Sequence, residues 1–132
     1  MDFTLYLPVT TVAASLNGLL LVVMTLSIAL TRRRDSISYG DGGNAGFAKR
    51  QRGHANATEQ IPIGLILILL AELQGASYAV LWTSAGLLTL GRILHALQFW
   101  FRPAPFLLRP TGITLTLIAH VIVIIWLLRA IY

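Results

Sequence analysis

The sequence predicts an all-α membrane protein, a single domain (residues 1–132) built as a bundle of four transmembrane helices. The composition is 56% hydrophobic and only 11% charged, and the mean hydropathy is +0.75. A soluble domain of this size would need more charged residues to cover its surface, so lipid must be its main solvent. Four long apolar runs, separated by short polar segments, are each long enough to cross the hydrocarbon core, which takes about 20 residues.

The spans are expected at about residues 5–30, 50–74, 78–100 and 111–132. The first apolar run is too long for a secretory signal and has no Lys or Arg before it, so we expect it to be retained. Its end is marked by Arg32, Arg33 and Arg34, and the Gly and Asp residues of 36–46 then favour turns over helix. Pro103 and Pro105 end the third span.

The distribution of basic residues predicts the orientation of the chain. Eight of the ten Lys and Arg residues lie in or beside two connections, residues 31–49 and 101–110. The positive-inside rule places these loops in the cytoplasm and both termini outside it. The net charge of +5 does not indicate nucleic-acid binding, because a nucleic-acid footprint needs a continuous basic face.

Polar side chains enter the second span where lipid cannot solvate them. Arg52, Asn56 and Glu59 fall at i, i+4 and i+7, which is one stripe of a helix. An acidic residue at the centre of a span costs roughly 2.5 to 3.5 kcal/mol on insertion scales, and less near the interface. Glu59 is therefore expected to face protein or a water-filled cavity and to have a partner.

The third span offers such a partner, since Arg92 and His95 lie at i and i+3 in an apolar segment. In antiparallel spans, Glu59 and Arg92 come to a similar depth. One interpretation is a structural ion pair that sets the helix register and binds nothing. The other is a polar cavity shared with Arg52, His54, Asn56 and His95, in which the excess of arginine favours an anionic or zwitterionic ligand.

Other polar features have simpler interpretations. His120, in the middle of the fourth span, is expected to make an interhelical hydrogen bond. Glu72 is expected to lie at the outer interface, and the glycine-rich loop 39–43 to form a turn. No metal site is predicted, and the absence of cysteine excludes thiolate ligands and a cysteine nucleophile.

Three segments resemble the membrane-associated proteins in eicosanoid and glutathione metabolism (MAPEG): RGHANATEQIP from Arg52, GRILHA from Gly91, and RPTG, which begins at Arg109. The SYGDGG loop is similar to that of a bacterial inner-membrane branch related to glutathione S-transferases. The resemblance implies a homotrimer in the inner membrane. Glutathione would be bound as co-substrate between adjacent subunits near the cytoplasmic face, and a small hydrophobic substrate would enter from the bilayer.

Carried over to this chain, the resemblance assigns residues to glutathione. Arg52, Asn56 and Glu59 match positions that hold the charged and polar groups of the peptide, and His54 matches an assisting polar position. Arg32 resembles an arginine at the end of the first helix that reaches a glutathione carboxylate. We also expect Gln60 and Arg92 to belong to this binding set.

Arg109 resembles the arginine that stabilises the thiolate in catalytic members, which makes physical sense because a nearby guanidinium lowers the pKa of a thiol. His95 is the second catalytic candidate, as a donor or a base. Active relatives often have tyrosine at the positions of Gln60 and His95, and Phe99 replaces another aromatic hydroxyl. Loss of these phenols removes donors to the ligand.

The leading hypothesis is therefore a glutathione transferase or peroxidase-like enzyme that acts on a hydrophobic electrophile. One alternative keeps the fold and drops catalysis, which leaves a glutathione-binding or structural trimer. Another is a small proton-coupled multidrug exporter, which also uses four short helices and one membrane carboxylate. Two features oppose the exporter: the first span has no acid at its middle, and arginines would repel a cationic drug.

Overall fold

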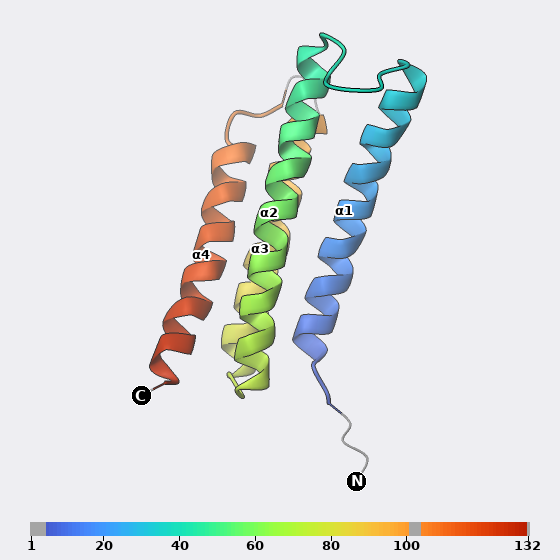
Figure 1. Cartoon of the computed structure of the whole chain (residues 1–132). Helices are drawn as coiled ribbons and strands as arrows, with labels where there is room; N and C mark the ends of the chain where they lie inside the picture. The colour runs from blue at the N-terminus through green and yellow to red at the C-terminus, as the bar shows by residue number, and fades with distance from the viewer. Residues whose placement is uncertain (1–4, 101–103, 132) are drawn as a thin grey trace.

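The computed structural model describes residues 5–100 and 104–131, so Arg102 of the second predicted loop lies outside the described part. The described residues form four helices: α1 (Pro8–Arg34), α2 (Ala45–Leu73), α3 (Tyr78–Trp100) and α4 (Leu108–Arg129) (Figure 1). All four are long and apolar enough to span a membrane. The prediction of an all-α four-helix membrane bundle is confirmed.

Two helices begin earlier than the hydropathy pattern indicated. α2 begins at Ala45 and not near residue 50, because the Asn44 side chain accepts hydrogen bonds from the backbone N–H groups of Gly46 and Phe47. α4 begins at Leu108 and not at 111, which places Arg109 in its first turn. Arg109 lies in the first turn of α4, and Lys49 and Arg50 directly follow the first turn of α2, so apolar character alone underestimates the length of both helices.

The helices run alternately up and down, and the start of α1 and the end of α4 lie at the end opposite the α1–α2 connection (Figure 1). α2 and α3 form the middle of the bundle. α1 and α4 each pack on α2 and α3, and within residues 5–100 and 104–131 no Cα atom of α1 lies within 8 Å of one of α4. Large apolar side chains on the outward faces of all four helices are exposed, as lipid contact requires.

Glycine allows α3 and α4 to approach backbone to backbone. A Cβ atom on Gly91 would lie 2.8 Å from the carbonyl oxygen of Gly112, and one on Gly112 would lie 2.6 Å from that of Gly91. No side chain fits in this contact, which is typical of small-residue packing between membrane helices. The contact sets the rotation of α3 and α4 about their axes.

Two further glycines set the face that α2 turns to α3 and α4. The ring of Phe99 lies over Gly53, where a Cβ atom would come within 2.6 Å of it. Leu88 and the Nε2 atom of His120 lie over Gly64 in the same way. His120 Nε2 is buried and has no hydrogen-bond partner in the described part of the chain.

The first turn of α1 is capped by a residue distant in sequence. Glu72 accepts hydrogen bonds from the backbone N–H of Val9 (3.0 Å) and of Thr10 (2.7 Å). α1 has no side-chain cap of its own. The Glu72 carboxylate accepts hydrogen bonds from free N–H groups at the start of α1, and its negative charge interacts favourably with the helix dipole there. Glu72 was predicted to be only interfacial, and the structure shows in addition that it ties the end of α2 to the start of α1.

Further along α1, three side-chain hydrogen bonds hold it to the middle of the bundle: Asn17–Thr89 (2.8 Å), Thr25–His54 (2.9 Å) and Ser27–Trp100 (3.3 Å). Hydrogen bonds between membrane helices contribute to their association, because in lipid the alternative is an unsatisfied polar group. The position of α1 relative to α2 and α3 is therefore set along most of its length.

Candidate functional site

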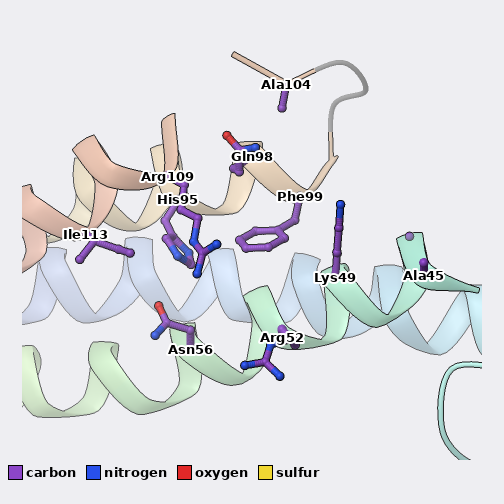
Figure 2. A pocket seen from close by; sticks show the side chains of 11 residues that line it. Ala45, Lys49, Arg52, Asn56, His95, Gln98, Phe99, Ala104, Arg109 and Ile113 are labelled. Carbon is purple, nitrogen blue, oxygen red and sulfur yellow. The ribbon is translucent and has the colours of Figure 1, made fainter. Parts of the chain in front are cut away.

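A polar cavity of about 690 Å³ lies at the end of the bundle where α2 begins (Figure 2). Its walls come from three helices and the segment before α4: Ala45, Gly46, Lys49, Arg52 and Asn56 of α2; His95, Gln98 and Phe99 of α3; Ala104; and Arg109 and Ile113 of α4. A volume of this size is typical of sites for small organic ligands.

α2 contributes one polar stripe to the cavity. Lys49, Arg52 and Asn56 are spaced by three and four residues, so they project from the same side of the helix. Gly53, next to Arg52, is buried beneath Phe99. This contact fixes the rotation of α2 and turns the stripe towards α3 and α4.

α3 and α4 supply the opposite wall. His95 is 3% exposed, and its ring centroid lies 5.2 Å from that of Phe99. A Cβ atom on Gly112 would lie 2.7 Å from the backbone nitrogen of His95, so the first turn of α4 lies directly against α3 there. Arg109, three residues before Gly112, consequently faces the same cavity as His95 (Figure 2).

Behind this wall lies a buried arginine. Arg92 is 2% exposed, and its guanidinium donates to Thr116 Oγ1 (2.8 Å), Asn56 Oδ1 (2.9 Å) and the carbonyl of Gly112 (3.5 Å). These three acceptors are neutral. Because the Asn56 oxygen accepts from Arg92, the amide NH₂ group of Asn56 is left to donate elsewhere.

The structure does not form the ion pair between Glu59 and Arg92 that their similar depth had suggested. In the described ranges, the only ion pair joins the adjacent residues Arg34 and Asp35. Glu59 is exposed on α2, whereas Arg92 points to Asn56 and α4. Depth was predicted from the sequence, but the side of each helix that faces its neighbour was not.

Of the residues predicted to bind or activate glutathione, the cavity brings together Arg52, Asn56, His95 and Arg109, with Arg92 behind Asn56. The others do not line it. His54 is turned to Thr25 of α1, Gln60 is half-buried on α2, and Glu59 is exposed. Arg32 lies over the ring of Phe47 and donates to the carbonyls of Ile37 and Ser38 (both 3.4 Å).

Sequence reasoning missed two polar residues of the cavity, Lys49 and Gln98. Helical spacing could have identified both, because Lys49 lies three residues before Arg52 and Gln98 three residues after His95. Residues three positions apart lie on the same side of a helix. Gln98 Oε1 is buried and has no partner within the described residues. Both side chains add polar groups to the lining of the cavity.

The lining is cationic. Lys49, Arg52 and Arg109 border the cavity, Arg92 lies behind it, and its walls contain no Asp or Glu among the described residues. Walls that carry charge of one sign in a low-dielectric surrounding attract the opposite charge. Guanidinium groups in particular match the geometry of carboxylates and phosphates. The cavity is therefore suited to an anionic ligand.

Comparison with known proteins identifies the same family that the three sequence segments resemble. The sequence model of the MAPEG family matches residues 10–129. Inner membrane protein YecN of Escherichia coli strain K12 is 31% identical over 112 residues, which cover 85% of this chain and 84% of that protein. The protein of the same name from Escherichia coli O6:H1 matches equally well. No solved structure matches the chain. The chain belongs to the MAPEG family.

Proposed function

We propose that this protein lies in the bacterial inner membrane and binds glutathione in the cavity between α2, α3 and α4. The observation that carries this proposal is a basic cavity without an acidic residue in its described lining, in a chain of the MAPEG family. Glutathione has two carboxylates, one ammonium group and a thiol, so it is a net anion at neutral pH. The name of the relatives supports the location, and the basic connections favour a cytoplasmic position of the cavity.

Apart from Gln98, each polar residue of the cavity has a role in this proposal. Lys49 and Arg52 pair with glutathione carboxylates near the mouth. The Asn56 amide, held by Arg92, donates to a peptide carbonyl. The ammonium group needs an acceptor that the described lining does not contain. Glu59 and Gln60 supply it from the outer side of α2 once an adjacent subunit covers that side, as in the homotrimer that the family resemblance implies.

Arg109 and His95 are proposed to activate the thiol. A guanidinium beside the sulfur stabilises the thiolate, and His95 or water takes the proton. The thiolate then attacks a hydrophobic electrophile from the bilayer, a carbon–sulfur bond forms, and the leaving group departs with its electron pair. With a lipid hydroperoxide, attack on oxygen gives an alcohol and a sulfenic acid, which a second glutathione converts to the disulfide and water.

Calorimetry on the detergent-purified full chain tests the binding step. Arg52→Ala is expected to weaken glutathione binding at least about tenfold, since a charge-assisted contact contributes about 1.5 to 3 kcal/mol. Arg33→Ala is the matched control, because Arg33 is exposed at the same end of the bundle and does not line the cavity. Equal affinities of both variants and the unmodified protein would refute the proposal.

A binding protein without turnover is the second candidate. It is favoured by Gln60, His95 and Phe99, which stand where catalytic relatives often carry phenols. Turnover of glutathione with an aryl halide or a lipid hydroperoxide separates the two candidates. The cation exporter is disfavoured, because the described walls of the cavity carry basic groups and no carboxylate that could exchange a proton for a drug.

A further inference from the structure

A second cavity, with a volume of about 410 Å³, lies beside the basic cavity between α2, α3 and α4. It is lined by Asn44, Gly46, Arg50, Phe99 and Trp100. Gly46 and Phe99 also line the basic cavity, so the two spaces meet at these residues. Gly46 has no side chain that could divide them. The wall between the two cavities is therefore the side chain of Phe99.

The ring of Phe99 is held from two sides. Against α2, a Cβ atom on Gly53 would come within 2.6 Å of the ring, so the ring packs directly on the buried backbone of that residue. Against α3, the centroid of the ring lies 5.2 Å from that of His95 (Figure 2). The ring is thus a fixed wall, and its removal would join the two cavities over Gly53.

The second cavity has two donors that suit a carboxylate. One is Arg50, which is half-buried and forms no ion pair within residues 5–100 and 104–131. The other is Asn44, whose side-chain oxygen accepts from the backbone N–H groups of Gly46 (3.0 Å) and Phe47 (3.1 Å). This arrangement leaves the amide NH₂ group of Asn44 to donate. A guanidinium and an amide donor can bind the two oxygens of one carboxylate.

In the binding mode proposed above, the glycine end of glutathione lies nearest to this wall. The ammonium group belongs to the γ-glutamyl end, which is directed to Glu59 and Gln60 further along α2. Lys49, at the other end of the polar stripe, is left for the glycine carboxylate. Lys49 follows Gly46 by three residues, so it lies on the side of α2 where the two cavities meet. A peptide extended at its glycine end would therefore meet Phe99.

We propose that Phe99 is a specificity-determining residue, whose ring limits the peptide ligand to the length of glutathione. Without the ring, the second cavity accepts the carboxylate of a longer γ-glutamyl peptide, with Arg50 as its main partner. This inference rests on the proposed function, because it takes the orientation of glutathione from it. It names the ligand as the tripeptide thiol and excludes peptides that are longer at the carboxyl end.

Phe99→Ala tests the wall by calorimetry on the detergent-purified full chain. The two ligands are glutathione and glutathione extended by one glycine at its carboxyl end. We expect the unmodified protein to bind the longer peptide at least about tenfold more weakly than glutathione. Phe99→Ala is expected to bind the longer peptide at least about tenfold more tightly than the unmodified protein does, since a charge-assisted contact to Arg50 is gained.

Two further variants at this position separate the wall from the fold. Phe99→Tyr keeps the ring and is the matched control, which should reject the longer peptide as the unmodified protein does. Phe99→Val also removes the ring but keeps a larger side chain than alanine, so the test does not depend on one variant keeping its fold. The affinity of each variant for glutathione checks that the basic cavity is intact.

Arg50→Gln, added to Phe99→Ala, tests the second cavity. The gained affinity for the longer peptide is expected to be lost, because the partner of the new carboxylate is removed, whereas the affinity for glutathione stays the same. S-hexylglutathione is the control ligand. It is extended at the thiol, which lies towards Arg109 in the proposed mode, so Phe99→Ala should not bind it more tightly than the unmodified protein does.

Four outcomes overturn this inference while glutathione binding stands. Equal affinity of the unmodified protein for both peptides would show that Phe99 sets no limit. Rejection of the longer peptide by Phe99→Ala and Phe99→Val would place the limit elsewhere. A gain that survives Arg50→Gln would exclude the second cavity, and an equal gain for S-hexylglutathione would show a general loosening. Absence of glutathione binding by the unmodified protein would instead contradict the proposed function, and this inference with it.

Discussion

The Arg92 guanidinium donates to Asn56 Oδ1 across 2.9 Å and so joins the buried face of α3 to the polar stripe of α2. The same guanidinium contacts Thr116 and Gly112 of α4, which makes Arg92 the point where three helices meet. Its acceptors are neutral, and the cavity beyond Asn56 has a cationic lining. The hydrogen bond from Arg92 therefore orients the Asn56 amide, which faces the cavity, and places a positive charge behind it.

Arg92→Lys tests this arrangement. Lysine keeps the charge but has a single nitrogen, which cannot reach three acceptors in a fork. The free energy of unfolding is expected to fall by about 1 to 3 kcal/mol, since buried polar groups are left unpaired. Unfolding by sodium dodecyl sulfate in mixed micelles measures it, with the exposed Arg33→Lys as control. Equal stability of the two variants would contradict the role of Arg92.

Arg109→Ala is expected to change the reactivity of bound glutathione more than its affinity. Without the guanidinium, the pKa of the bound thiol should return towards that of free glutathione, since a nearby cation favours the thiolate. Ultraviolet absorbance of the thiolate, followed against pH in the presence of the protein, measures this change. The expected result is a higher midpoint in Arg109→Ala than in the unmodified protein. An unchanged midpoint would assign thiol activation to another residue.

Glu59→Gln tests whether an adjacent subunit completes the site. Glu59 does not line the cavity of one chain, so a ligand held by one chain alone should bind the variant normally. A ligand bound between subunits loses the partner of its ammonium group, and the affinity for glutathione is expected to fall at least about tenfold. Calorimetry measures the affinity, and size-exclusion chromatography checks that the assembly is retained. Normal binding would argue for a single-chain site.

Gly91→Ala tests the close contact between α3 and α4. The added Cβ atom would meet the backbone oxygen of Gly112 at 2.8 Å, so the helices must separate at a cost of about 1 to 3 kcal/mol. Gly86→Ala is the matched control on the same helix, because a Cβ atom there meets nothing within 4 Å. Thermal unfolding in detergent should show a lower midpoint for Gly91→Ala only. A similar loss in both variants would indicate a general effect of alanine on α3.

The sequence by itself determined the fold class and the four spans, because the length of an apolar run is matched to the thickness of the bilayer. It also indicated the stripe of Arg52 and Asn56, since spacing on one helix depends only on helical geometry. For the same reason Lys49 and Gln98 could have been found.

Only the tertiary structure decided which side of each helix faces its neighbour. The close contacts of Gly91 with Gly112 and of Gly53 with Phe99 set the rotation of each helix about its axis. The hydropathy pattern does not reveal these contacts. They turn Arg92 towards Asn56 and leave Glu59 exposed. The capping of α1 by Glu72 likewise depends on how two helix ends meet in space. Packing determines which side chains on two different helices come into contact. Packing in turn depends on the shape of the helix surfaces at positions where the sequence shows only small residues.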